Sequence, residues 1–381
     1  MTAALGQVPH TVFRATDDLT ADAPPEQRGM TRDGVRLLVA SDEGGGTPHV
    51  THTAFRRVGE HLAPGDLLLV NTSATVAAEV DGWVAGRGDV VVHVATELDD
   101  GTWVVELRTA PDAARPVLDA AEGEVVELAP EGPRMGLLAP YPRAGSSPAG
   151  SGNRLWTAAE LDGRGLARHL ADQGRPIAYG YLRGRFPLEA YQTVFAHVPG
   201  SAEMPSAARP FTTRLVTDLV SSGVLVAPIT LHTGLSSQEA GEAPQPERFA
   251  VPAATASLVN HVRATGGRVV AVGTTATRAI ESAADEDGTV HPAAGWTDDV
   301  ISPVRPARVV DGLVTGWHNP DASHLLLVES VAGEALTQVA YDEAVAHRYA
   351  WHEFGDAGLF LGVGGCRTCT SSSPRTATPA P

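Results

Sequence analysis

The chain has 381 residues, of which 43% are hydrophobic and 19% are charged, so disorder is excluded for most of its length. Its 28 basic and 45 acidic residues give a formal net charge of −17, which argues against broad electrostatic binding to nucleic acid. Because single hydrophobic cores stop growing below this length, we expect two domains.

The first half of the chain is rich in strand-like segments. "GVRLLVA" and "PGDLLLVNTSATV" are apolar runs that predict two early strands. After them, "DVVVHVATEL", "TWVVELRTA", "GEVVELAP" and "MGLLAPYP" are short, alternating and separated by Gly, Asp and Pro. Such regular spacing predicts a small antiparallel barrel or sandwich. For residues 146–174 we expect a Gly/Ser-rich loop followed by a helix.

From Tyr191 onward, strand and helix patterns alternate. We expect a strand in "YQTVFAHV", an amphipathic helix in "FTTRLVTDLVSSG", a buried strand in "VLVAPITLHTG" and a helix in "PAATASLVNHVRATGG". "RVVAVGTTATRAIESAA" then predicts a strand, a tight turn and a helix. The alternation indicates an α/β domain with a mixed or parallel sheet that resembles an open barrel.

The simplest division of the chain makes the β-rich stretch an insertion. We predict an α/β domain from residues 1–76 and 175–363, an inserted β-barrel-like domain over 77–174, and a disordered tail over 364–381. No apolar run reaches the roughly 18 residues that span a membrane, and no basic and apolar leader opens the chain. We therefore expect a cytoplasmic protein without membrane association.

The two cysteines, Cys366 and Cys369, form a C-x-x-C pair in the Ser/Thr/Pro-rich tail. Zinc requires further ligands, and a redox pair is expected beside a packed βα turn. We therefore interpret the pair as part of the tail and expect no metal.

Polar residues cluster where three strands are predicted to end: "TLHTGL" with His232, "VGTTATR", and "TGWHNPDASH" with His318. Open α/β sheets bind ligands at that edge, so these ends are the candidate site. A histidine whose hydrogen bonds are satisfied within the core is the alternative interpretation of His232.

The "VGTTATR" turn is suited to an anion. Gly273 permits a tight turn, Thr274 and Thr275 can cap the helix, and the open N–H groups there suit a carboxylate or phosphate. Arg278 would lie in the first helical turn beside that anion. The alternative is a capped helix in which Arg278 pairs with Glu281 or is solvated.

Common nucleotide, metalloprotease and hydrolase motifs are absent from the sequence. The order of its unusual segments, however, resembles S-adenosylmethionine:tRNA ribosyltransferase-isomerases, the enzymes of queuosine biosynthesis. The resemblance covers about Arg28 to Leu361, and that family is similar in having an α/β domain interrupted by a small β-barrel. It is carried by "GDLLLVNTS", "YQTVFA", "GSAEMPSAARPFT", "ITLHTGL", "PERFAVP", "RVVAVGTTATRAIES", "GWTDDVISP", "GLVTGWHNP" and "RYAWHEFGDAGLF".

The resemblance implies S-adenosylmethionine as co-substrate, tRNA as partner and no metal. In the reaction that the resemblance implies, the ribosyl portion of S-adenosylmethionine would move to the aminomethyl group of a 7-deazaguanine base in tRNA, with release of adenine and methionine. Such chemistry requires a base for the C5′ proton, a proton for departing adenine and contacts to the methionyl end. The implied catalytic residues are His232, His318, Glu247 and Asp298. The implied substrate-binding residues are Tyr191, Gln192, Pro205, Ser206, Arg209, Thr274, Thr275 and Arg278.

The chain departs from the family pattern at several positions. Ala208, Arg209 and Pro210 stand where family members have glycine, leucine and histidine, and Gln245 replaces a second histidine. Basic residues are missing at Ser73, at Glu79 and at Asp321 or Ala322.

Loss of basic residues weakens phosphate contacts, and a glutamate among them adds repulsion. Arg175, Arg183 and Arg185 are expected to form either a small basic patch or a solvated loop. Two alternatives to the tRNA reaction follow from these departures: ribosyl transfer to a small-molecule acceptor, and a catalytically silent nucleoside-binding protein.

Overall fold

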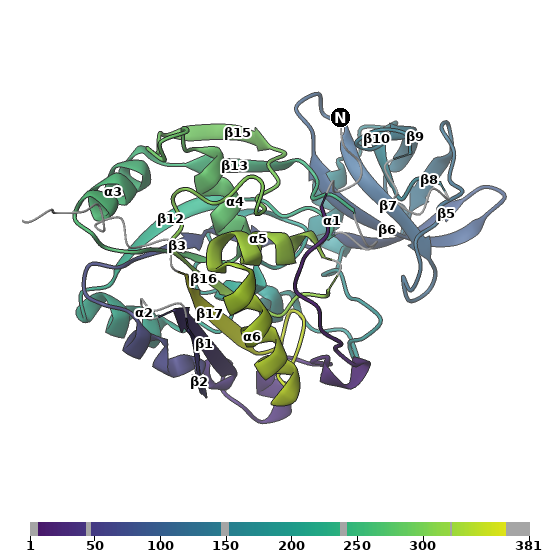
Figure 1. The fold of residues 1–381 in the computed structure, drawn as a ribbon. Helices are drawn as coiled ribbons and strands as arrows, with labels where there is room; N and C mark the ends of the chain where they lie inside the picture. Colours follow the sequence, from purple (N-terminus) through teal and green to yellow (C-terminus); the bar gives the residue numbers. More distant parts are fainter. Residues whose placement is uncertain (1–6, 43–46, 146–151, 237–241, 321, 363–381) are drawn as a thin grey trace, which may run out of the picture.

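An α/β domain and a β-barrel lie side by side in the computed structural model (Figure 1). The structure describes residues 7–42, 47–145, 152–236, 242–320 and 322–362. A nine-stranded mixed sheet with the order β15-β13-β12-β3-β14-β16-β17-β1-β2 forms the α/β domain. Its strands are β1 (Arg36–Asp42), β2 (Pro48–Ala54), β3 (Leu67–Asn71), β12 (Leu225–Leu231), β13 (Glu247–Val251), β14 (Val269–Val272), β15 (Ala293–Thr297), β16 (Gly312–Thr315) and β17 (Ala357–Leu361).

Helices α2 to α6 pack against this sheet, and α1 packs on the barrel. The α-helices are α1 (Leu166–Gln173), α2 (Thr213–Ser221), α3 (Ala253–Ala264), α4 (Thr274–Ser282), α5 (Ser323–Ala332) and α6 (Glu334–Ala346). The 3₁₀ segments are η1 (Asp17–Leu19), η2 (Pro25–Arg28), η3 (Arg32–Gly34), η4 (Phe55–His61), η5 (Leu188–Tyr191) and η6 (Ser206–Ala208).

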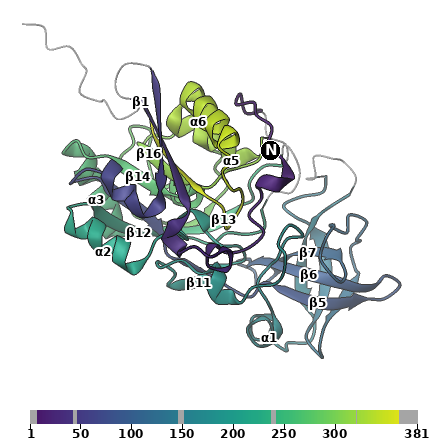
Figure 2. The ribbon, with the colours of Figure 1, turned by 90° about the horizontal axis from the view of Figure 1, so that it is seen from below.

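Both faces of the sheet are buried along its central strands, as the near-continuous apolar runs of β3 and β14 require. In β1, Leu38 and Ala40 pack in a core shared with α3 to α6, whereas Leu37 and Val39 pack with Phe55 and α2 on the other face. Successive side chains of a strand point to opposite faces, so one apolar run serves both cores. Figure 2 shows α6 and α2 on opposite sides of β1.

Four central strands, β12, β3, β14 and β16, run parallel to one another. Their carboxyl ends therefore meet at one edge of the sheet, where open α/β sheets bind ligands. β17 is antiparallel to β16, with Thr315 opposite Gly358. The residues that precede β17 consequently lie at the same edge as the residues that follow β16.

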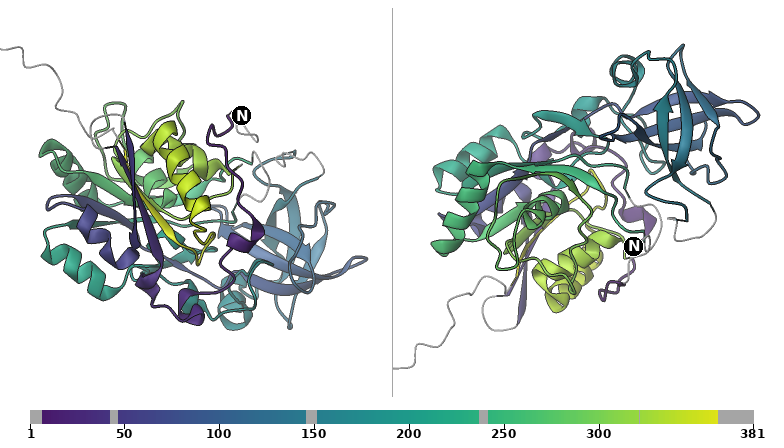
Figure 3. Two further views of the ribbon diagram at one scale, coloured as in Figure 1. Left: turned by 60° about the horizontal axis from the view of Figure 1, so that its bottom comes forward. Right: turned by 90° about the horizontal axis from the view of Figure 1, so that it is seen from above.

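The barrel is inserted at this edge. The chain leaves the main sheet through β4 (Ser73–Thr75) and returns through β11 (Val198–Ser201), and these two short strands pair in parallel. The barrel between them is closed in the order β10-β7-β6-β5-β8-β9, and Figure 3 shows it as a separate lobe. Its strands are β5 (Glu79–Val84), β6 (Gly88–Glu97), β7 (Trp103–Thr109), β8 (Val125–Leu128), β9 (Arg134–Pro140) and β10 (Leu155–Glu160).

The predicted α/β domain with a small all-β barrel is confirmed, and its sheet is mixed. The domain boundaries at residues 76 and 174 stay a prediction. The predicted tail over 364–381, with Cys366 and Cys369, lies outside the described residues, as does Asp321.

Two local predictions were wrong. "YQTVFAHV" is not a strand, because Tyr191 ends η5 and only the last residue of the segment belongs to β11. The side chain of Gln192, rather than its backbone, pairs with the backbone of Thr75, donating to its carbonyl at 2.7 Å. The other wrong prediction concerns residues 146–174, where we expected only a loop and a helix. This segment also contains β10, which pairs with β7 and β9 and closes the barrel.

Candidate active site

A cavity of about 570 Å³ lies at the carboxyl edge of the parallel strands, facing the barrel. Its size is within the range of pockets that hold small organic ligands. The segments after β12, β14 and β16, the segment before β17 and the barrel residues Arg108 and Ala114 all line it. Seven of the sequence-predicted residues are among its lining: Pro205, Ser206, Glu247, Thr274, Thr275, Arg278 and His318.

The turn between β14 and α4 forms one wall. Gly273 has φ +96° and precedes the helix, and a Cβ at this position would lie 3.3 Å from the Cβ of Ala207 in the segment "GSAEMPSAARPFT" (residues 200–212), which we call the signature loop. Glycine is favoured here both by the backbone conformation and by this close approach. Thr274 and Thr275 occupy the first turn of α4, so the positive end of the helix dipole opens toward the cavity.

Arg278 and Glu247 form an internal ion pair at the cavity wall. Arg278 also donates to the carbonyl oxygens of Asp299, Gln245 and Thr297 at 3.1–3.3 Å. Glu247 accepts a further hydrogen bond from the backbone N–H of Gly234 at 3.1 Å. Burial raises the pKa of Glu247, and the guanidinium of Arg278 opposes that shift. Two residues expected to act separately on substrate therefore bind each other.

His318 lies beside a second histidine of the cavity. Its ring is stacked on that of His324 with centroids 4.9 Å apart, and its Nε2 lies 2.8 Å from the hydroxyl of Thr315. Burial, together with the nearby His324 and His352, holds the pKa of His318 well below its ordinary value. His318 is consequently a neutral imidazole at neutral pH.

Two glutamates of the cavity, which we call the cavity acids, were not singled out from the sequence: Glu203 and Glu353. Glu203 accepts hydrogen bonds from the hydroxyls of Tyr179 and Ser236 and, at 2.8 Å, from the backbone N–H of Ser236. Tyr181 makes a side-chain hydrogen bond with Glu353. Within the described residues, no cation forms an ion pair with either acid, and the buried Oε2 of Glu353 has no hydrogen-bond partner.

The environment of Glu353 keeps it protonated. Burial, followed by the charge of Glu203, raises the pKa of Glu353 to about 8. The signal available in the sequence was an acid inside each of two otherwise apolar or small-residue segments, "SAEMPS" and "YAWHEFG". Strongly shifted carboxyls of this kind are typical of functional sites.

Asp298 does not line the cavity; it is exposed, and its neighbour Asp299 faces the cavity instead. His232 lies at the end of β12, but its Nδ1 is 2.7 Å from the hydroxyl of Ser73 on β4. Burial, with Arg248 nearby, lowers the pKa of His232. Neither residue is among the cavity lining.

Three further predicted residues do not line the cavity: Tyr191, Gln192 and Arg209. Tyr191 is buried, and Gln192 pairs with β4. Arg209 is also buried; it donates to the carbonyl of Ala190 at 2.8 Å and to Glu26 at 2.9 Å. These contacts are structural in kind.

The interpretation of Glu79 as a surface charge that repels phosphate was wrong. Glu79 is fully buried, and its carboxylate pairs with Arg175 at 2.7 Å, Arg185 at 2.6 Å and His93 at 3.1 Å. Two of the three arginines expected to form a basic patch are therefore neutralised internally. The third, Arg183, donates to the carbonyl of Gln27 at 3.0 Å.

Glu79 belongs to a group of buried charges on the barrel wall, which we call the barrel cluster: Glu79, His93, Glu106, Arg108 and Arg154. Glu106 contacts Arg108 at 2.7 Å, Arg154 at 3.4 Å and His93 at 3.5 Å. Arg154 continues to Glu242, at 2.7 Å, on the α/β side. The barrel cluster thus links the two lobes by paired charges.

Comparison with known proteins extends over both lobes. A profile described as "Queuosine biosynthesis protein" matches residues 10–360. An S-adenosylmethionine:tRNA ribosyltransferase-isomerase of Symbiobacterium thermophilum is 35% identical over 354 residues, covering 90% of this chain and 96% of the relative. One of the same name from Moorella thermoacetica is 34% identical over 364 residues, covering 91% and 99%.

Among solved structures, a crystal structure of an S-adenosylmethionine tRNA ribosyltransferase from Thermotoga maritima covers 92% of this chain and 99% of its own, with 26% identity and a TM-score of 0.49. In the described ranges, no helix combines the length and apolar character needed to cross a membrane. The family indicated by the sequence resemblance is confirmed by the relatives and the profile: this chain belongs to the queuosine biosynthesis protein family, a family of enzymes.

Proposed function

We propose that this protein is an S-adenosylmethionine:tRNA ribosyltransferase-isomerase. It would transfer the ribosyl portion of S-adenosylmethionine to the aminomethyl group of a 7-deazaguanine base in tRNA, form the epoxycyclopentanediol of epoxyqueuosine, and release adenine and methionine. Relatives that cover about nine-tenths of the chain carry that name. Because tRNA is the proposed acceptor, we place the protein in the cytoplasm.

The observation that carries the proposal is the acidic cavity at the carboxyl edge of the sheet. S-adenosylmethionine bears a sulfonium and an ammonium cation against one carboxylate. Glu203 has no cationic partner among the described residues, so a cationic ligand complements its charge. Tyr179, Tyr181 and Trp317 add aromatic surface to the same cavity, which favours a cation and a flat base.

The methionyl carboxylate is proposed to bind at the first turn of α4. Thr274, Thr275 and Ser206 line the cavity there, and a helix N-terminus attracts an anion. Arg278 lies behind this turn in its pair with Glu247, where it positions the wall rather than meeting the ligand directly.

His318 is the proposed base for the C5′ proton, which the adjacent sulfonium acidifies. A base must be unprotonated before it acts, and the depressed pKa of His318 provides a neutral imidazole at neutral pH. The hydroxyl of Thr315, 2.8 Å from Nε2, orients the ring.

Glu353 is the proposed acid for departing adenine. Its pKa of about 8 keeps the carboxyl protonated at neutral pH, as a general acid requires. The proton would pass from the carboxyl oxygen to an adenine nitrogen as the glycosidic bond breaks. Burial and the negative charge of Glu203 hold Glu353 in that state, and the contact with Tyr181 opposes them only in part.

The departures from the family pattern at Ser73 and Glu79 do not favour an acceptor other than tRNA. Both side chains are buried in contacts within the protein, Ser73 with Ser201 and His232, and Glu79 with arginines. Neither side chain therefore meets phosphate at the outer surface. No observation on the described residues favours a small-molecule acceptor.

The direct test is to incubate the full chain with S-adenosylmethionine and tRNA that carries the 7-aminomethyl-7-deazaguanine base. We expect equal amounts of free adenine and modified nucleoside, measured by liquid chromatography and mass spectrometry. The matched controls are the same tRNA with guanine at that position and S-adenosylmethionine alone. Adenine release without tRNA modification would contradict the proposal that tRNA is the acceptor. No adenine release in any of the three reactions would contradict the proposal that the protein is an enzyme of this kind.

A further inference from the structure

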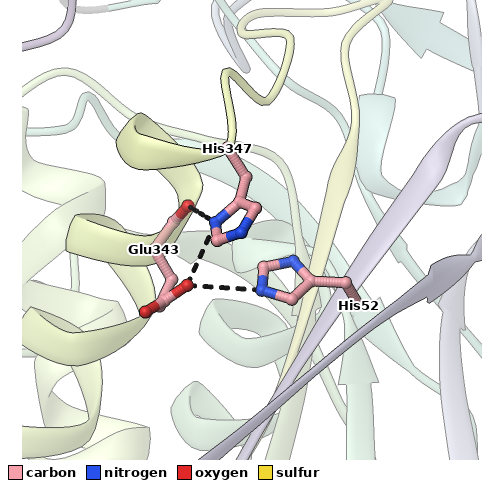
Figure 4. Close-up of side chains that lie close together, drawn as sticks. All are labelled: His52, Glu343 and His347. Atoms are coloured by element: carbon pink, nitrogen blue, oxygen red, sulfur yellow. Dashed lines mark hydrogen bonds and ion pairs between the residues drawn. The ribbon is translucent and has the colours of Figure 1, made fainter.

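A group of potential metal ligands lies between the outer strand β2 and helix α6 (Figure 4). His52 comes from β2, Glu343 comes from the last turn of α6, and His347 is the residue that caps the end of this helix. One Glu343 carboxylate oxygen lies 3.3 Å from His52 Nε2 and 3.0 Å from His347 Nδ1. One ligand atom from each residue lies within 4.8 Å of the others.

The local structure places these ligands before any ion arrives. Glu343 and the C-cap residue His347 are four residues apart, so they share a face of α6; His347 Nδ1 also lies 3.0 Å from the backbone carbonyl oxygen of Glu343, a contact that a bound ion would replace. The other nitrogen of His52, Nδ1, lies 3.0 Å from the hydroxyl of Tyr349. Metal-bound histidines usually make such a contact through their second nitrogen, which leaves the first free for the metal.

We propose that His52, Glu343 and His347 bind a zinc ion. Two imidazoles and a carboxylate are a ligand set that zinc accepts, with water completing four-fold coordination. Ligand atoms about 2.1 Å from a tetrahedral zinc lie about 3.4 Å apart, close to the spacings around Glu343. The three side chains are partly exposed, so water can reach the ion.

The site stands apart from the proposed reaction, since none of its three ligands lines the cavity. β2 is the last strand of the nine-stranded sheet and pairs on one side with β1. An ion held by β2 and α6 together would fix this edge strand to the helix. Binding to the folded chain alone stabilises it in proportion to the logarithm of free zinc.

Zinc affinity of the untagged full chain tests the proposal. The background is Cys366→Ser with Cys369→Ser, because a C-x-x-C pair is itself a zinc ligand. Competition with a chromophoric chelator should give one zinc per chain. Affinity should fall at least about tenfold in His52→Ala and in His347→Ala, as expected when one of three protein ligands is lost.

His291→Ala is the matched control, because His291 is exposed and pairs with a single carboxylate, Asp285, at 3.0 Å. It should bind zinc like the background chain. Zinc should also raise the midpoint of thermal unfolding in the background and in His291→Ala, but not in His52→Gln, which keeps a neutral polar side chain. Unchanged affinity in His52→Ala and His347→Ala, or zinc binding that disappears with the cysteines, would overturn the proposal.

Discussion

The barrel cluster and the cavity acids both contain glutamates inside the protein, yet the carboxyls of Glu106 and Glu353 hold their protons over opposite pH ranges. In the barrel cluster, the close approach of His93 and the charges of neighbouring arginines outweigh burial and hold the pKa of Glu106 at about 2. In the cavity, burial and the charge of Glu203 raise the pKa of Glu353 to about 8. The same side chain is an anion in one place and a neutral acid in the other.

The difference in pKa follows from the partners of the two groups of acids. Acids of the barrel cluster meet cations inside the protein, so their charge is satisfied and joins the barrel to the α/β domain. The cavity acids lack such partners among the described residues, an arrangement that costs folding stability. Such a cost is typical of sites kept for a ligand or for proton transfer.

The largest expected effect is that of Glu106→Gln on stability. The change leaves Arg108 and Arg154 buried without the carboxylate they share, and should lower the free energy of unfolding by about 3–5 kcal/mol. Urea unfolding followed by circular dichroism measures it. Glu122→Gln, on an exposed residue, should change stability by less than about 0.5 kcal/mol.

The pH dependence of this effect has a definite sign. The pKa of Glu106 is about 2 in the folded protein against an ordinary value of 4.5. Its contribution to stability is therefore present above pH 4.5 and lost as the pH falls through about 2. A loss in Glu106→Gln that is equally large at pH 2 and at pH 7 would contradict the paired state of Glu106.

Glu353→Gln should have the next largest effect, with activity and stability moving in opposite directions. Without its proton donor, turnover of S-adenosylmethionine should fall about 100-fold. The unfolded chain loses the Glu353 proton near the ordinary pKa of 4.5 and the folded chain near 8, so ionisation destabilises the native protein as the pH rises between these values. Glutamine cannot ionise, so the variant should be more stable by about 1–3 kcal/mol at pH 8.

Rate and stability profiles against pH check this prediction together. The parent should lose activity as the pH rises through about 8, and that limb should vanish in the residual activity of Glu353→Gln. If the variant is less stable than the parent at pH 8, or equally active, Glu353 has a structural role like that of the paired acids in the barrel cluster and is not the proton donor.

The smallest expected effect is that of Arg209→Gln. Arg209 was expected to bind substrate, but its guanidinium is occupied by Glu26 and the carbonyl of Ala190 and lies 5.0 Å from the ring centre of Phe354. We expect about 1–2 kcal/mol lower stability and a KM for S-adenosylmethionine within about twofold of the parent. Steady-state kinetics at saturating tRNA measure the KM. A tenfold higher KM in the variant would indicate that Arg209 does contact S-adenosylmethionine.

Much of the fold could be predicted from local sequence patterns. The apolar runs of β1, β3, β12 and β14 and the Gly-Thr-Thr turn before α4 were evident from composition and spacing alone, because a buried strand or a tight turn depends on neighbouring residues. The order of unusual segments was enough to identify the family. It also led to cavity residues such as Ser206, Thr274 and His318.

What the sequence by itself determined is therefore the alternation of elements, the family and the polar ends of the strands. Only the tertiary structure decided which charges meet. Glu79 stands where the family has a basic residue, and only the fold shows that it pairs with Arg175 and Arg185. Only the fold buries Glu353 near Glu203, which raises its pKa to about 8. The reason is that burial and partners, which set a pKa, come from residues far apart in the chain and brought together by the sheet edge and the barrel.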